Sequence, residues 1–285
     1  MINIKNLSQK FNKKLVLDDI SLDIKKGDIH FVIGTSGTGK TVLVKHLVGL
    51  LKPYKGEIIF ENKDITKLKE KGLNKVRKKI TYVFQHSTLF DNLTLYENIE
   101  LPLIKTKIDT HNHKTETHNH QVETHDHQVE MHDHQVETYG RASLPQNDHM
   151  SSPVSQLVEK YLKLVGIEEY KNKYPYEIGD SIKKRTAIAR GLAMNPEYII
   201  YDEPTTGLTF ADARNIDNLI FEMSRKLNVT AIVISHDLKS IFSIADRITM
   251  LYQGKILLDG TKEDFKNSRN EIVQQFINGR AEGPI

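Results

Sequence analysis

The sequence predicts an α/β fold with a largely parallel sheet and a separate antiparallel β part. Short apolar runs typical of buried strands alternate with helical patterns through the second half of the chain. In the first half, an apolar run at 29–33 leads through a glycine-rich turn into a helical pattern. Strand-like alternation of apolar residues before residue 25 predicts the antiparallel part.

Composition limits the kind of protein. A chain of 285 residues can bury a substantial core. Its formal charge of +3 is dispersed, which argues against nucleic acid as a partner but suits work near an anionic membrane. The absence of cysteine excludes disulfides and thiolate metal sites. No apolar run reaches the roughly 18 residues that span a bilayer, so we expect a soluble chain whose membrane role needs a partner.

The individual elements follow in order along the chain. Apolar runs predict strands at 2–7, 15–17, 20–24, 29–33, 56–60, 80–84, 198–201, 230–235, 248–252 and 255–259. Amphipathic patterns predict helices at 42–51, 154–165, 181–194, 212–227, 238–244 and 272–277. Asp180 and Ser181 are candidate caps for the helix at 181–194.

The composition changes abruptly between about residues 105 and 153. Five tandem seven-residue units occupy 107–141, and each has at most one clearly apolar residue. A coiled coil needs two apolar residues per heptad, so this repeat does not predict one. So little apolar surface cannot offset the entropy lost on ordering, and we therefore predict a disordered, histidine-rich insert.

The glycine-rich turn has the pattern G-x-x-x-x-G-K-[ST]. It consists of Gly34, Thr35, Ser36, Gly37, Thr38, Gly39, Lys40 and Thr41. Such glycines let successive backbone N–H groups surround phosphate oxygens, and the following helix adds the positive end of its dipole. Lys40 is expected to reach the β- and γ-phosphates, and the Thr41 hydroxyl to ligate Mg²⁺.

Four further sites, with five residues in total, carry candidate chemistry. Asp202 and Glu203 end a buried strand, where Asp202 can hold Mg²⁺ through water and Glu203 can act as a general base. His236 follows another strand and can contact the γ-phosphate and the attacking water. Gln85 ends the strand at 80–84 and can contact Mg²⁺ or that water. Phe11 can stack on an adenine face.

These motifs, in this order, resemble those of the ATP-binding-cassette ATPases. The resemblance covers nearly the whole chain apart from the repeat insert, and a signature helix is expected near residue 180. It implies a RecA-like P-loop NTPase domain at 1–260, with a helical subdomain at about 87–195, and a C-terminal extension at 261–285. In that family two cassettes enclose two ATP molecules head to tail, so the expected cofactors are ATP and Mg²⁺ and the expected partner is a second copy.

A narrower resemblance is to the Mce/Mla-type lipid-transport ATPases. It rests on 84–94, 97–99, 101–103, 244–247 and 275–284. It implies an ATPase at the cytoplasmic face of the inner membrane of a Gram-negative cell, driving phospholipid transport between the inner and outer membranes. The implied partners are a membrane permease dimer and, indirectly, a periplasmic lipid-binding protein. The similar tail implies a contact with the neighbouring ATPase.

The chain departs from the family pattern at two places. The signature L-S-G-G-[QM] is replaced by Ile178-Gly179-Asp180-Ser181-Ile182, which puts an acid where the partner's γ-phosphate should approach. Either Ser181 acts as the helix N-cap and still offers its hydroxyl to ATP in trans, or Asp180 turns away and hydrolysis is slow. After Gly207-Leu208, the usual aspartate is replaced by Thr209-Phe210, which is expected to alter coupling between the two sites.

Three alternatives to phospholipid transport stay open. The cassette can serve an importer of another solute, or it can regulate by binding ATP with weak turnover. The third alternative is a metal-buffering role for the insert, which contains four H-x-H pairs, at His111/His113, His118/His120, His125/His127 and His132/His134. A repeat-expanded, solvated linker explains the same histidines, because a flexible tract has no preorganised ligand geometry.

Overall fold

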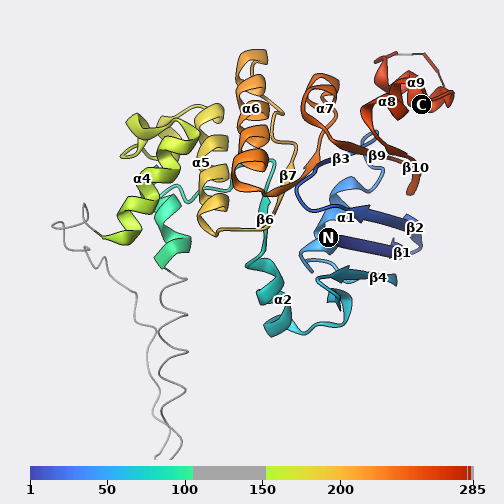
Figure 1. Ribbon diagram of the computed structural model, residues 1–285, viewed down its shortest axis with the longest axis horizontal. Coiled ribbons are helices and arrows are strands. Elements are labelled where there is room, and N and C mark those ends of the chain that lie inside the picture. Colours follow the sequence, from blue (N-terminus) through green and yellow to red (C-terminus); the bar gives the residue numbers. More distant parts are fainter. Residues whose placement is uncertain (105–151, 281, 284–285) are drawn as a thin grey trace, which may run out of the picture.

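The computed structural model describes residues 1–104, 152–280 and 282–283, which form two sheets with helices around them (Figure 1). The six-stranded sheet has the order β10-β9-β3-β8-β7-β6, and the four-stranded sheet has the order β2-β1-β4-β5. The strands are β1 (Ile2–Phe11), β2 (Lys14–Ile24), β3 (Ile29–Ile33), β4 (Lys55–Phe60), β5 (Lys63–Asp64), β6 (Ile80–Val83), β7 (Tyr198–Asp202), β8 (Thr230–Ile234), β9 (Arg247–Tyr252) and β10 (Lys255–Gly260). The predicted α/β fold with an antiparallel part is confirmed.

The helices surround the larger sheet and extend from both of its ends. They are α1 (Lys40–Leu47), α2 (Glu70–Arg77), α4 (Pro153–Val165), α5 (Asp180–Ala193), α6 (Phe210–Leu227), α7 (Leu238–Ile244), α8 (Lys262–Lys266) and α9 (Glu271–Ile277). In Figure 1, α4 and α5 lie at the left end and α8 and α9 at the upper right. Among the described residues, no helix is long and apolar enough to cross a membrane.

Parallel pairing dominates the larger sheet. β3 pairs in parallel with β8 and β9, β8 with β7, and β7 with β6. Parallel strands place their carboxyl ends at the same edge of a sheet, which is where ligands bind in open α/β folds. The segments that follow β3, β6, β7 and β8 therefore meet at one edge.

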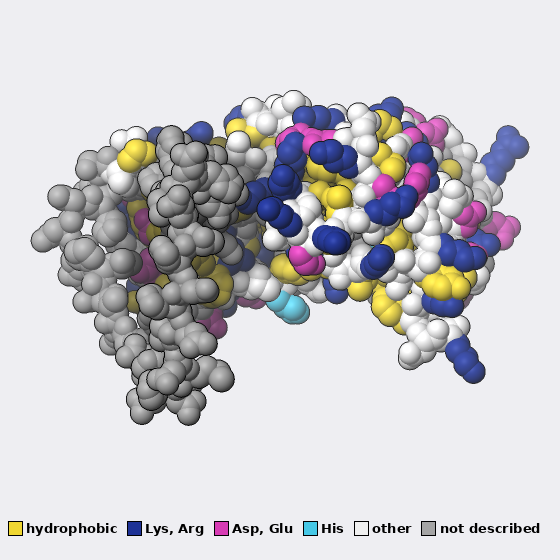
Figure 2. Space-filling view, turned by 90° about the horizontal axis from the view of Figure 1, so that it is seen from below, with side chains coloured by type: hydrophobic (Ala, Val, Ile, Leu, Met, Phe, Trp, Pro, Cys, Tyr) yellow, Lys and Arg dark blue, Asp and Glu magenta, His cyan; other side chains and the backbone are white. Residues whose placement is uncertain are grey.

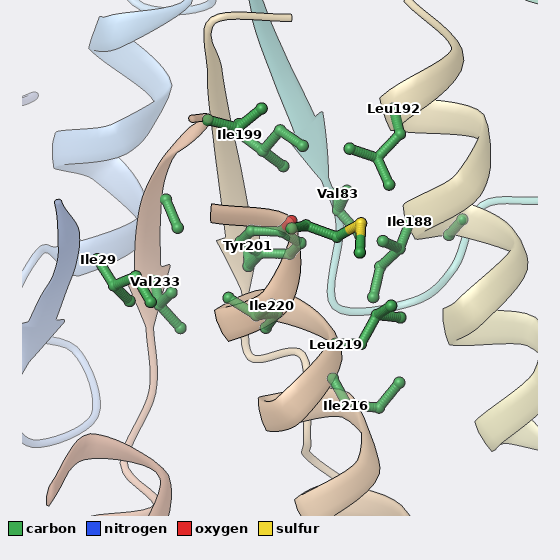
Figure 3. Close-up of a cluster of buried hydrophobic side chains, with 14 of the residues drawn as sticks. Ile29, Val83, Ile188, Leu192, Ile199, Tyr201, Ile216, Leu219, Ile220 and Val233 are labelled. Carbon is green, nitrogen blue, oxygen red and sulfur yellow. The ribbon is translucent and has the colours of Figure 1, made fainter. Parts of the chain in front are cut away.

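A hydrophobic core joins the sheet to α5 and α6 (Figure 3). Ile199, Tyr201 and Val233 lie on the sheet side of this core. Ile188 and Leu192 of α5 pack toward them, and Ile216 and Ile220 of α6 fill the space between. All of these side chains are buried, so α5 is held firmly against the strands.

The structure differs from the sequence predictions at a few boundaries. Helices α2 and α8 were not predicted, because each is short and rich in charged residues. Residues 95–104 are helical although their apolar pattern is irregular. Helix α4 begins at Pro153 with the Ser152 hydroxyl as its cap, one residue before the predicted start at 154. Residues 105–151 of the predicted histidine-rich insert lie outside the described residues.

A buried histidine connects the central strand to the edge of the sheet. His30 of β3 is fully buried, and its Nε2 lies 2.7 Å from the Thr249 hydroxyl. Thr249 in turn donates to Asp259, which is paired with Arg247. Burial lowers the pKa of His30 from 6.5 to about 4, with Asp259 acting in the opposite direction. The imidazole is therefore neutral in the folded protein at neutral pH.

We expect His30 to make the protein less stable in acid. A histidine whose pKa is lower when folded binds protons preferentially in the unfolded state, so its stabilisation is present above pH 6.5 and is lost as the pH falls toward 4. Between pH 7 and pH 5 this loss is about 2 kcal/mol. The fall in the free energy of unfolding in urea between these pH values should be about 2 kcal/mol larger in the wild type than in His30→Gln.

The comparison between the two proteins removes the contribution of other groups. Burial raises the pKa of Asp217 to about 6, which acts in the opposite direction but is common to both proteins. An equal pH dependence in wild type and His30→Gln would contradict the assignment of this effect to His30.

Candidate functional site

The glycine-rich turn between β3 and α1 can exist only with glycine at two of its positions. Gly34 and Gly39 have φ values of 141° and 100°, in the left-handed region. A Cβ atom at Gly34 would lie 2.3 Å from the Leu251 carbonyl oxygen, and one at Gly39 would lie 2.7 Å from Leu17 Cδ2. The backbone thus lies flat against its neighbours, with Ser36 and Gly37 exposed at its tip.

The first turn of α1 is open to an anion. No side chain caps this helix, and its first turn contains no acidic residue. Backbone N–H groups at such an end attract phosphate oxygens through hydrogen bonds and the helix dipole. The Thr38 hydroxyl donates 2.9 Å to the Thr35 carbonyl and stabilises the turn from within. The turn therefore has the geometry of a candidate phosphate cradle.

Lys40 folds back over this cradle. Its Nζ atom donates to the carbonyl oxygens of Gly34 and Thr35 at 2.8 and 2.9 Å. Burial lowers the pKa of Lys40, whereas the nearby carboxylates of Glu203 and Asp202 raise it. The ammonium therefore lies between the glycine-rich turn and the two acids.

Asp202 is the buried acid at the end of β7. It is 8 % exposed, and its Oδ2 accepts a hydrogen bond of 2.7 Å from the Tyr82 hydroxyl. Burial raises the pKa of this carboxyl, and the Tyr82 hydroxyl opposes the shift. Carboxylate and hydroxyl oxygens are the hard donors that Mg²⁺ prefers, so Asp202 and Thr41 fit that ion chemically.

Glu203 is held in a strained backbone conformation. Its φ is 50°, which is unfavourable for a residue with a side chain. Its N–H donates to the Ile234 carbonyl at 2.9 Å. Its carboxylate accepts from the Thr206 hydroxyl at 3.0 Å and lies 3.0 Å from His236 Nδ1. Both carboxylate oxygens therefore face the histidine that follows β8, at 2.9 and 3.0 Å from its Nδ1.

Lys184 connects this acid to Gln85. The Lys184 side chain extends from α5 and is buried, and its Nζ donates to the carbonyl oxygens of Gln85 at 3.1 Å and Glu203 at 3.3 Å. Burial lowers the pKa of Lys184, opposed by Asp180 and Glu203. The Gln85 side chain is exposed just beyond β6. One ammonium thus ties the segments after β6 and β7 together.

The segment that carries His236 is anchored by a second polar cluster. Asp237 caps α7 by accepting from the backbone N–H groups of Lys239 and Ser240. Arg214 of α6 pairs with Asp237 at 3.0 Å and with buried Asp217 at 2.7 Å. These bonds hold the turn after β8 beside Glu203.

Phe11 ends β1, where it pairs with Lys14 of β2, and its side chain is 44 % exposed. Val16 and Leu17, a few residues further along β2, contact the position of Gly39. The hairpin that carries this exposed ring therefore packs against the glycine-rich turn.

The prediction that Ser181 caps the signature helix is wrong. Helix α5 begins at Asp180, and the extended residue before it, Gly179, offers no side-chain cap. The Ser181 hydroxyl donates to Asp212 of α6 at 3.0 Å. Asp180 is highly exposed and lies 3.7 Å from the ammonium of Lys183. The sequence suggested a cap because serine precedes the apolar pattern, but the helix starts one residue earlier.

Sequence reasoning missed three of the residues that shape this site. Tyr82 lies three positions before Gln85, and Lys184 lies in the basic triplet after the signature, but neither position reveals a contact with the acids. Arg214 resembles any exposed helical arginine. Their partners are distant in the sequence, and no local pattern identifies them.

Several known proteins are similar to this chain over most of its length. The family model described as ABC transporter matches residues 17–206. The chain is 32 % identical to the intermembrane phospholipid transport system ATP-binding protein MlaF of Haemophilus influenzae, over 100 % of this chain and 93 % of that protein. It is also 32 % identical to the methionine import ATP-binding protein MetN 1 of Bacillus cereus, over 98 % of this chain and 70 % of that protein.

A solved structure is similar over almost the same length. A dimeric post-hydrolysis state of an ATP-binding cassette bound to ADP and phosphate superposes with a TM-score of 0.70 at 26 % identity, covering 92 % of this chain and 98 % of that one. The family match spans more than half of the chain and contains the phosphate cradle and both acids. The chain therefore belongs to the ABC transporter family, as one of its ATP-hydrolysing cassettes.

Proposed function

We propose that this cassette hydrolyses Mg-ATP to drive phospholipid transport between the inner and outer membranes through a permease partner. The observation that carries the hydrolytic part is the Glu203 carboxylate, held by Thr206 and His236 beside Lys40. The phospholipid part is supported by full-length similarity to a protein of an intermembrane phospholipid transport system.

Each residue of the site has a role in this proposal. The cradle amides and Lys40 bind the phosphates, and Thr41, Asp202 and Gln85 hold the magnesium ion, which supplies charge neutralisation on the phosphate oxygens. Glu203 takes a proton from water as the water oxygen bonds to the γ-phosphorus and the bond to the leaving oxygen of ADP breaks. His236 and Gln85 orient that water, and Phe11 stacks on the adenine.

A second copy of the chain completes each site in this proposal. The N-terminus of α5, with Ser181, would face the γ-phosphate held by the other copy. Exposed Asp180 repels a phosphate there, and Lys183 offsets this charge only in part. Asp180 is therefore the specific observation that favours a second candidate function, a regulatory cassette that binds ATP and turns it over slowly.

The permease is expected to dock in a groove beside β6. This groove has a volume of about 740 Å³ and is bordered by α2 and α5. Exposed Phe84, Phe90 and Leu101 line it together with Arg77 and Arg190. An apolar and basic lining fits a helical permease segment that carries apolar and acidic side chains.

The surface that carries α2 supports a position of this protein at a membrane. Figure 2 views the molecule from the side on which α2 projects in Figure 1, and lysine and arginine side chains are spread across it. Exposed lysines of α2 and the segment before it contribute to this charge, and anionic lipids attract such a surface. We infer a peripheral position at the cytoplasmic face of the inner membrane.

The proposed division of the chain follows the packing. The cassette would comprise 1–260, with the helical subdomain at about 87–195, and the C-terminal extension would comprise 261–285. Phe265 of α8 and Val273 of α9 are buried in the main core, so the extension packs on its own cassette. Its exposed side is the surface available to the neighbouring copy.

Reconstitution tests the proposed cargo. The cassette and its permease, placed in liposomes with labelled phospholipid, should move lipid only with ATP, and ATP hydrolysis should rise with lipid supply. ATP hydrolysis that responds to another solute, such as methionine, and not to phospholipid would replace this cargo with that solute.

We expect Glu203→Gln to lower turnover roughly 10²-fold while ATP still binds, because the amide keeps the shape but cannot accept the proton. Steady-state hydrolysis and nucleotide binding by the assembled complex measure the two effects. Glu222→Gln, an exposed change on α6, is the matched control and should leave both unchanged. Turnover near that of the wild type would remove Glu203 from the role of base.

We expect Lys184→Met to lower turnover roughly 10-fold to 10²-fold, because Glu203 and Gln85 lose the ammonium that holds their carbonyl oxygens. The Gln85 carbonyl, left without a donor, also costs about 1–3 kcal/mol of folding stability, whereas the Glu203 carbonyl keeps a hydrogen bond of 3.3 Å from the Thr206 N–H. Hydrolysis and urea unfolding should be measured beside Lys226→Met, whose side chain pairs with Glu222 at the surface of α6. A loss of stability with unchanged turnover would limit Lys184 to a structural role.

A further inference from the structure

The Tyr82 side chain contacts Asp202, one of the candidate magnesium ligands, directly. Its hydroxyl donates to Asp202 Oδ2 at 2.7 Å, and the two residues are 120 positions apart in the sequence. β6 and β7 pair in parallel, with Tyr82 opposite Ile200. Side chains two residues apart on a strand share a face, so Asp202 and Tyr82 lie on the same side of the sheet.

The bond distinguishes the two carboxylate oxygens of Asp202. Oδ2 is taken by the tyrosine hydroxyl, which leaves Oδ1 as the oxygen available to a metal ion or to its bound water. Hydrogen-bond partners of a metal-ligating carboxylate commonly fix its orientation.

Tyr82 also lines the groove beside β6. Tyr82 and Phe84 both line it, and their ring centroids are 4.4 Å apart. Phe84 is 39 % exposed, so an occupant of the groove would contact this ring pair. Tyr82 thus has its ring in the groove wall and its hydroxyl on the acid.

We propose that Tyr82 is a positioning residue that orients Asp202 for Mg²⁺ and makes magnesium affinity depend on ring packing in the groove. The inference rests on the proposed Mg-ATP function and deepens it. It assigns a residue outside the phosphate cradle, the acids and the histidine to control of the metal. It also gives the groove a direct physical connection to the nucleotide site.

Magnesium titration of Tyr82→Phe tests the positioning role. The full chain is mixed with a fluorescent, non-hydrolysable ATP analogue, and binding is followed as Mg²⁺ is added. The variant keeps the ring and loses the hydroxyl, so half-maximal binding should need roughly 10-fold more Mg²⁺. Binding of the analogue in EDTA should match the wild type. Tyr201→Phe removes a neighbouring buried hydroxyl on β7 and should leave the magnesium requirement unchanged.

Phe84→Ala tests the connection with the groove. It removes the stacked ring without touching Asp202, and it should raise the magnesium requirement in the same direction as Tyr82→Phe. The double variant should resemble Tyr82→Phe alone, because both changes act through one hydroxyl. Additive effects, or no effect of Phe84→Ala, would overturn the connection.

Two other outcomes separate this inference from the proposed function. A wild-type magnesium requirement in Tyr82→Phe, or an equal loss of binding with and without Mg²⁺, would overturn the positioning role while the cassette still binds Mg-ATP. A wild-type chain that binds the analogue without any dependence on Mg²⁺ would instead overturn the proposed Mg-ATP function, and the inference with it.

Discussion

The parallel register of β3, β8 and β7 is the constraint on which the site depends. Val32 and Asp202 both pair with Ile234, so the start of the phosphate cradle, the end of β7 and the turn before His236 lie at one level. Side chains alternate along a strand, and a shift of one residue would turn Asp202 to the opposite face. The apolar side chains on both faces of the sheet prevent such a shift, so core packing determines the geometry of the polar site.

The site also depends on contacts that offset the backbone strain at Glu203. A left-handed backbone at a glutamate persists only where neighbouring contacts hold it. Here the Ile234 carbonyl, the Thr206 hydroxyl and the Lys184 ammonium supply those contacts. Lys184 can do so because Ile188 and Leu192 anchor α5 in the core (Figure 3). A hydrophobic contact on the helix side thereby stabilises an acid at the strand end.

The N-terminus of α5 shows two electrostatic demands in conflict. An acid in the first turn stabilises a helix through its dipole, and Asp180 occupies that position. The same charge opposes an approaching phosphate, which a glycine would not do. In the proposed function, the chain therefore combines its own candidate phosphate and metal ligands with an altered surface toward the nucleotide of a second copy. The conflict would lie at the interface between copies and not in the glycine-rich turn.

Much of this architecture is evident in the sequence. β-Branched apolar runs mark the central strands, and the spacing of glycines and Lys40 marks the cradle, because both patterns are local. The acids and His236 could be grouped because each follows a predicted parallel strand. The short, lysine-rich α2 escaped prediction, since its charge hides its two buried positions, Leu73 and Val76.

Local sequence patterns thus predict the fold class, the glycine-rich turn and the two acids, since neighbouring residues specify each of them. The way in which these parts are supported follows from contacts that form only in the folded chain. Tyr82 meets Asp202 across 120 positions, and Lys184 meets Gln85 across 99. Contacts between such distant residues arise from strand pairing and helix packing, which leave no mark in local spacing.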